Sequence, residues 1–310
     1  MLLEGEEEVG SVSLEPWLQQ ARNEVRADVA VISDTGMWDI NTPAVTTRLR
    51  GMLYTQVTLQ GPNRDLHSGL FGGSALNPIN ALTRILGKLK DEAGRILIPG
   101  FYDDVKEVSG AETVQWQALG FDEPAFLREI GLSVPDGERD RLPLERLWSR
   151  PTADINGIWG GYIGPGAKTV IAADAHAKIS FRLVPDQNPA HILEGVKHFF
   201  TDKLPRDAKL SVEALSSGRP IALDPNSQWV RVAVEALRDE YGREPVLTGS
   251  GGSIPVVETF RRTLGIDSLL MGFGLADDQV HSPNEKFEMR CFHHGIRSHT
   301  RLPHKLAALA

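Results

Sequence analysis

The chain has 310 residues, 41% of them hydrophobic, and a formal net charge of −8 at pH 7. This length suffices for a large core and suggests two domains, while the acidic balance argues against a nucleic-acid partner and is compatible with cation sites. Cys291 is the single cysteine and cannot form an internal disulfide. With no apolar run of about 18 residues and no signal-peptide pattern at its start, the chain is expected to be cytoplasmic and without a membrane span.

Acidic residues dominate the beginning of the chain, where residues 4–11 read Glu-Gly-Glu-Glu-Glu-Val-Gly-Ser. One interpretation is a solvated acidic segment. The other is the exit of a strand, where one of the adjacent carboxylates of Glu7 and Glu8 holds a metal and its neighbour transfers a proton. The octapeptide alone leaves both interpretations open.

A helix is predicted from Ser13 to Arg22, followed by a buried parallel strand from Asp28 to Ser33 that ends at Asp34. With a strand before Glu7, this order is a βαβ unit that has carboxylates at both strand exits. Ligands of open α/β sheets bind at that edge.

The pattern then changes, because residues Thr46–Gln60 alternate as an antiparallel strand with one solvent-facing side does. Helices are predicted from Asn77 and from Asn188 to Phe200, each beginning with a capping asparagine and a proline. Further strands are predicted at Thr169–Val184 and Lys209–Ala214. The β-α-β-β-α-β order predicts a ferredoxin-like domain over residues 46–226.

An α/β pattern resumes at Ser227, with a helix, a glycine-rich loop at Thr248–Ser253, a helix after Pro255, a strand at Ser268–Phe273 and a terminal helix. The predicted fold class is therefore an α/β domain, formed by residues 1–45 and 227–310, that is interrupted by the α+β domain.

Two histidines stand out as candidates for chemistry. His281 follows the last predicted strand, which would place it at the same sheet edge as Glu8 and Asp34; it is either a metal ligand or a surface residue. Imidazole with carboxylates suits zinc, manganese or cobalt better than calcium. His67 lies among glycines after the first strand of the insertion, where it either caps a local turn or acts in a site that a second subunit completes.

Two other features carry weaker signals. The glycine-rich loop does not match a nucleotide-binding motif, and backbone donors for a substrate carboxylate are the better interpretation. His293, His294 and His299 in the terminal helix are expected to face solvent.

Six motifs then occur in order: Glu-Gly-x-Glu-Glu-x-Gly-Ser at 4–11, Ile-Ser-Asp at 32–34, Arg-Asp-Leu-His-Ser-Gly at 64–69, Arg-Leu-Val-Pro at 182–185, Gly-Gly-Ser-Ile-Pro at 251–255 and His-Ser-x-Asn-Glu at 281–285. The series resembles the M20 metallopeptidases, most closely their cytosolic non-specific dipeptidase and carnosinase branch. The resemblance implies a zinc-peptidase-type α/β catalytic domain interrupted by a dimerisation (lid) domain, and hydrolysis of dipeptides or short peptides by a homodimer.

The resemblance also implies roles for individual residues. They are Glu7 as general base, Glu8 and His281 as ligands of one zinc, Asp34 as a ligand of the other, His67 as a donor offered to the partner subunit's site, and Arg182, Thr169 and Ser253 as substrate-binding residues. Two zinc ions per site are expected, with Mn²⁺ or Co²⁺ as substitutes.

Two departures from the family pattern matter. A histidine that the dipeptidase branch carries near residues 215–220 is absent, so substrate contacts are expected to differ. The family's N-terminal part supplies a His-x-Asp motif and an aspartate that bridges the metals, yet none of the nine histidines here is followed by x-Asp. We therefore expect a chain without that N-terminal portion.

Two alternatives remain open at this point. One is an N-acyl amino-acid deacylase on the same fold, and the other is a non-enzymatic dimerising remnant, because a half-built site binds metal weakly.

Overall fold

The computed structural model describes residues 2–309, with Glu8 described in its backbone only. The chain divides into two compact units, one formed by Met1–Leu49 with Ile221–Ala310 and the other by Arg50–Pro220. No helix among residues 2–309 combines the length and apolarity that a membrane span requires.

The first unit is built on a mixed sheet in the order β1-β11-β2-β10, with β9 paired to β2. Parallel pairs join β1 to β11 and β10 to β2, whereas β11 and β9 run antiparallel to β2. The strands are β1 (Val29–Ile32), β2 (Ala44–Leu49), β9 (Ile221–Ala222), β10 (Val246–Ser250) and β11 (Asp267–Leu270).

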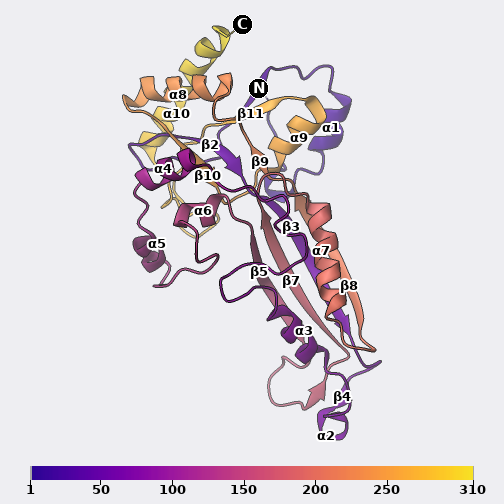
Figure 1. Cartoon of the computed structure of the whole chain (residues 1–310). Coiled ribbons are helices and arrows are strands. Elements are labelled where there is room, and N and C mark those ends of the chain that lie inside the picture. Colours follow the sequence, from indigo (N-terminus) through magenta and orange to yellow (C-terminus); the bar gives the residue numbers. More distant parts are fainter. Residues whose placement is uncertain (1, 310) are drawn as a thin grey trace. The chain divides into compact units, whose positions relative to one another are not determined.

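Within residues 2–309, four helices and one 3-10 turn accompany this sheet. Helices α8 and α10 lie side by side (Figure 1), and α1 contacts α9, which packs on β11. They are η1 (Glu7–Val9), α1 (Leu14–Gln20), α8 (Gln228–Tyr241), α9 (Pro255–Leu264) and α10 (Met289–Ala307). One apolar core joins buried residues of α8 and α10 to the sheet, including Val45, Leu237 and Leu269.

The second unit is the ferredoxin-like fold that the sequence predicts. Its antiparallel sheet has the order β5-β7-β3-β8, with helices α3 and α7 packed against it (Figure 1). The elements are β3 (Gly51–Gln60), α3 (Pro78–Leu86), β5 (Thr152–Gly160), β7 (Asp174–Leu183), α7 (Pro189–Asp202) and β8 (Lys209–Gly218). Strict alternation of buried and half-buried residues along β7 places one face in a core shared with α3 and α7.

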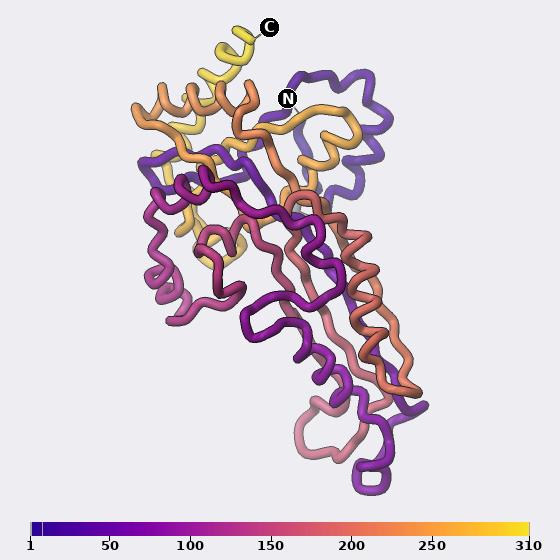
Figure 2. The backbone as a smooth tube through the Cα atoms, in the orientation of Figure 1, coloured from indigo at the N-terminus to yellow at the C-terminus, as the bar shows by residue number. Residues whose placement is uncertain are grey.

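Smaller elements extend this unit. Strands β4 (Leu66–His67) and β6 (Val170–Ile171), which are distant in the sequence, form a small antiparallel pair at one end of the sheet, and α2 (Ser68–Phe71) follows β4. Figure 2 traces the chain into this end from β3 and back to α3. Short helices α4 (Gly110–Ala118), α5 (Glu123–Glu129) and α6 (Pro143–Trp148) occupy the connection between α3 and β5.

Three details differ from the predicted elements. Glu7 and Glu8 lie in the 3-10 turn η1, and residues 2–6 contain no strand, so the predicted strand exit stays a prediction. The alternating stretch 46–60 is two strands, β2 and β3, in different sheets. Strand β1 is parallel as predicted but less buried, with Val31 37% exposed, because within the described chain it pairs with β11 alone.

Candidate active-site residues

The acidic segment at the start of the chain is a compact turn tied to the first helix. Gly10 ends η1 with a left-handed φ of 94°, a conformation that glycine adopts without strain. The carboxylate of Glu6 accepts hydrogen bonds from the Ser13 backbone nitrogen at 3.0 Å and from its Oγ at 3.2 Å. Glu7 is exposed on this turn, while the side chain of Glu8 lies outside the described part of the chain.

Asp34 and the segment leading to His281 leave the first unit's sheet next to each other. Strands β1 and β11 are parallel neighbours, and their exits continue side by side to a bridge between Gly36 and Gly274. Close approach is possible because Gly272 has no Cβ, which would otherwise collide with the Thr35 carbonyl oxygen. The predicted common edge for Asp34 and the chain that carries His281 therefore follows from the backbone pairing.

His281 lies in an exposed loop between β11 and α10. The backbone of this loop is unusual, with φ of 57° at Gln279, 61° at His281 and 64° at Asn284, all in the left-handed region. A buried residue, Asp278, closes the loop: it is 2% exposed, and its Oδ2 accepts a hydrogen bond from the Leu275 nitrogen at 2.7 Å.

Only part of a metal site can be traced. Asp34 and His281 provide a carboxylate and an imidazole, the donor chemistry that zinc, manganese and cobalt accept. Within residues 2–309, leaving aside the Glu8 side chain, no three His, Cys, Asp or Glu side chains gather closely enough to hold a metal ion. The donors therefore fit the expected metals in type, and the described residues supply an incomplete set.

The second unit brings His67 and Thr169 together. His67 ends β4, which pairs antiparallel with β6, and it lies opposite Val170, the residue after Thr169. The Ser68 nitrogen donates to the Thr169 carbonyl oxygen at 3.0 Å. His67 Nδ1 accepts a hydrogen bond from the Gly69 nitrogen at 3.0 Å and so caps α2. In a neutral imidazole this assignment puts the proton on Nε2, which makes Nε2 the donor atom of the ring.

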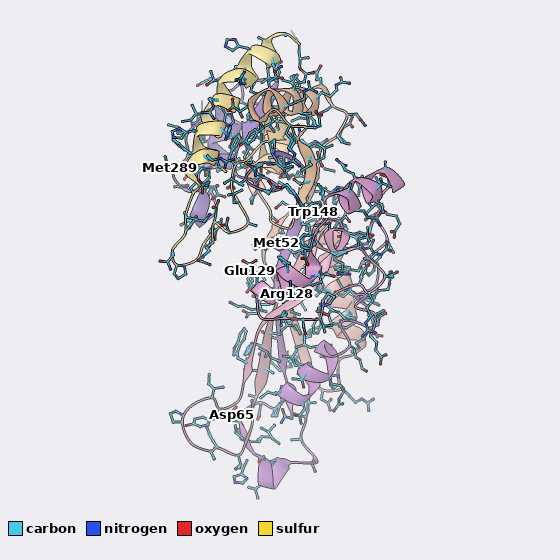
Figure 3. The ribbon with its side chains drawn as sticks, turned by 90° about the vertical axis from the view of Figure 1, so that its left-hand side faces the viewer. Met52, Asp65, Arg128, Glu129, Trp148 and Met289 are labelled. Atoms are coloured by element: carbon cyan, nitrogen blue, oxygen red, sulfur yellow. The ribbon has the colours of Figure 1, made fainter. Side chains whose placement is uncertain are left out.

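Asp65 fixes the position of this loop relative to the strands. Its Oδ1 accepts a hydrogen bond from the Ala173 nitrogen at 3.0 Å, which ties the segment before β4 to the segment between β6 and β7. Figure 3 labels Asp65 at this end of the sheet and Met52 toward the opposite end. In the Arg-Asp-Leu-His motif, the aspartate therefore has a structural role.

Arg182 is not part of the His67 and Thr169 pair. It lies near the end of β7, opposite Met52 of β3, and is separated from the start of β7 at Asp174 by eight residues, or about 26 Å along the strand. Burial and the positive charge of Arg182 lower the pKa of neighbouring Arg50 to about 10, and Asp154 opposes this effect. Two guanidinium groups therefore lie near each other at this end of the sheet.

Ser253 follows β10 in the predicted glycine-rich loop and is partly buried. The loop begins with a local turn in which the Gly252 nitrogen donates to Ser250 Oγ at 3.1 Å. Helix α9 then starts at Pro255, whose nitrogen carries no hydrogen. This start differs from a phosphate-binding helix, in agreement with the absence of a nucleotide motif.

The histidines of α10 are only partly as predicted. His293 is exposed, but His294 stacks on Tyr241 with ring centroids 4.3 Å apart, and His299 Nε2 lies 2.6 Å from Ser33 Oγ. The prediction that His294 and His299 face solvent is wrong, because partners from distant parts of the chain cover them.

Sequence reasoning also missed two interactions beside the candidate ligands. Ser33, held by His299, directly precedes Asp34, and Asp278 anchors the loop that carries His281. The acidic pair Asp277-Asp278 was visible in the sequence, but no local pattern distinguishes its buried member from its exposed one.

Comparisons with known proteins place these features in a family. The sequence profile of the peptidase dimerisation domain matches residues 47–208. A solved structure of an M20 family metallo-carboxypeptidase from Sulfolobus solfataricus is 30% identical and superimposes with a TM-score of 0.82, covering 96% of this chain and 68% of that one. The chain belongs to the M20 family.

Other relatives of this M20 chain are named as dipeptidases. The Cys-Gly metallodipeptidase dug1 of Schizosaccharomyces pombe is 34% identical over 100% of this chain and 66% of its own length. The human Beta-Ala-His dipeptidase is 31% identical over 92% of this chain and 57% of its own length. The M20 chain thus spans about three fifths to two thirds of these curated relatives.

Proposed function

We propose that this M20 protein hydrolyses peptide bonds in dipeptides or short peptides with the help of a divalent metal. Residues 1–45 and 227–310 would form the catalytic domain, and residues 46–226 the dimerisation domain. The observation that carries the proposal is the pairing of the β1 and β11 exits, which supports a common edge for Asp34 and the loop of His281. The relatives that match most of the chain are named as dipeptidases, which agrees with this proposed activity.

The proposed metal is zinc, with manganese or cobalt as substitutes. Glu8 and His281 would hold one ion and Asp34 the other. When bound, the ions would supply Lewis acidity and a water of lowered pKa. Glu7, which neighbours Glu8 on η1, would accept a proton from that water and return it to the leaving amine.

His67 is proposed to act on the developing oxyanion. Its Nδ1 is engaged by the Gly69 backbone, so Nε2–H is the atom that would donate a hydrogen bond. A donor placed in the dimerisation domain suits a site that a second subunit completes, and we therefore propose a homodimer in which His67 serves the partner's substrate.

Three further residues are proposed to hold the substrate. Arg182 would bind the terminal carboxylate through paired hydrogen bonds, which favours short peptides over long ones. Thr169, beside His67, and Ser253, in the loop after β10, would contact the peptide.

A cytoplasmic location is proposed because the lone Cys291 is buried and has no cysteine in the chain with which to pair.

The test is metal-dependent hydrolysis of Cys-Gly and β-Ala-His. Since the described residues supply an incomplete set of donors, the assay uses the chain alone and a fusion to the third of the Schizosaccharomyces pombe relative that it does not match. The fusion is expected to bind zinc, to hydrolyse dipeptides and to lose turnover in a chelator, with much lower turnover for the chain alone.

Two other outcomes would replace this proposal. Hydrolysis of N-acetyl amino acids in preference to dipeptides would identify an N-acyl amino-acid deacylase. A folded fusion that neither binds zinc nor hydrolyses any of these substrates would identify a non-enzymatic dimerising remnant, the alternative that the incomplete donor set favours for the chain alone.

A further inference from the structure

A buried carboxylate joins the two ends of the loop at residues 275–286. Asp278 Oδ2 accepts a hydrogen bond from the Leu275 nitrogen at 2.7 Å, and its Oδ1 accepts one from Lys286 Nζ at 2.9 Å. The Lys286 nitrogen also donates to the Asp278 carbonyl oxygen at 3.0 Å. One residue therefore fastens both the entry and the exit of the loop.

The ion pair is asymmetric in its exposure. Asp278 is 2% exposed, whereas the Lys286 side chain is 43% exposed and also lies 3.1 Å from Asp277 Oδ1. Hydrogen bonds from Lys286 to Asp278 and then to Asp277 raise the pKa of Lys286. A carboxylate withdrawn from water remains charged at low cost only while its partners stay in place, so Asp278 and Lys286 hold each other in one arrangement.

The residues between Asp278 and Lys286 need such a closure. They include His281, and three of them have left-handed φ values that side chains other than glycine adopt with strain. The Ser282 nitrogen donates to the Gln279 carbonyl oxygen at 2.9 Å, which makes a tight turn around the histidine. A loop fixed at both ends keeps this turn, whereas an open loop relaxes toward ordinary backbone conformations.

We propose that the Asp278–Lys286 ion pair is a positioning device that presents the imidazole of His281 to a metal ion. The inference rests on the proposed function, because it takes His281 to be a ligand. Asp278 does not touch the metal in this account. It acts through the backbone of the loop, as outer partners of metal ligands do when they set the orientation of a ligand.

The experiment measures protection of His281 by zinc in the fusion described under the proposed function, because the described residues alone supply an incomplete set of donors. Carbethoxylation of each histidine is followed by mass spectrometry over a zinc titration, with His191 of the second unit as an internal reference. In the protein without substitutions, zinc is expected to slow the carbethoxylation of His281. In Asp278→Asn and Lys286→Met, the zinc concentration that gives half-protection is expected to rise by about 10-fold or more.

Two variants separate positioning from a general effect on folding. Lys286→Arg keeps a cation within reach of Asp278 and is expected to restore half-protection close to that of the unmodified protein. Asp277→Asn changes a 70% exposed neighbour that contacts Lys286 but not Leu275, and is expected to have little effect. Circular dichroism checks that each variant folds. If Asp278→Asn does not fold, Lys286→Met provides the test, because the Lys286 side chain is half-exposed.

The outcomes distinguish the two proposals. If the zinc concentration that gives half-protection is the same in Lys286→Met as in the protein without substitutions, the positioning role is overturned and His281 remains a ligand. If zinc does not change the rate at which His281 is carbethoxylated in the protein without substitutions, the ligand role of His281 is overturned, and the positioning role with it.

Discussion

Among single residues, His299 is a histidine whose environment depends on distant partners. Its Nε2 shares a 2.6 Å hydrogen bond with Ser33 Oγ, and its ring meets Phe273 edge-on with centroids 5.7 Å apart. Burial disfavours the charged imidazole and lowers the pKa of His299 below its ordinary value of 6.5. The side chain therefore links helix α10 to the exit of β1, one residue before Asp34.

This environment predicts a dependence of stability on pH. As the pH falls from about 6.5 toward the lower folded-state pKa of His299, the unfolded chain takes up a proton that the folded chain does not, so the free energy of unfolding decreases. His299→Gln removes this contribution and should flatten the slope. Urea unfolding between pH 7.5 and pH 5 measures it, with exposed His304→Gln as the control, and an unchanged slope in His299→Gln would contradict the burial account.

Among elements, helices α8 and α10 are joined by a buried charge as well as by apolar packing. The Glu240 side chain is 4% exposed and receives hydrogen bonds from His294 at 2.7 Å, Arg297 at 2.6 Å and Arg301 at 3.2 Å. Burial raises the pKa of Glu240, but the bonds from Arg297, His294 and Arg301 outweigh it, so that this pKa lies below its ordinary value.

Removing this charge should loosen the helix pair. Glu240→Gln leaves two arginines and a histidine without their carboxylate and is expected to cost about 1–3 kcal/mol in the free energy of unfolding. Glu235→Gln provides a matched control on the same helix. The Glu235 side chain is 48% exposed, and its ion pair with Lys305, at 3.6 Å, is expected to contribute little to stability. Chemical denaturation measures both, and equal small losses would show that apolar packing alone joins the helices.

Local sequence signals predicted elements well where residues close together in the sequence determine them. Asn77 and Asn188 cap α3 and α7 with their side chains, each followed by proline, and the alternation along β7 matches its buried face. Predictions failed where tertiary contacts decide. The polar pattern of α10 did not reveal that Glu240 contacts His294 and Ser33 contacts His299, and the acidic run at Glu7 gave no sign of a 3-10 turn.

At the scale of the whole molecule, the proposed site needs two subunits. If His67 serves the partner's substrate, mixing His67→Ala subunits with Glu7→Gln subunits of the fusion should restore activity, because each mixed dimer keeps one site with both residues intact. The expected recovery is about one quarter of normal turnover after random exchange, since half of the dimers are mixed and each has one intact site. Turnover that stays at the level of the separate variants would place His67 in its own subunit's site or outside the reaction.

The account depends most on Glu7 as the proton acceptor beside metal ligands. The decisive measurement compares zinc content and dipeptide turnover of the fusion with those of its Glu7→Gln variant. We predict unchanged zinc content and a loss of turnover of about 100-fold or more, as expected for removal of a general base. A Glu7→Gln variant that keeps both its zinc and its turnover would contradict the account.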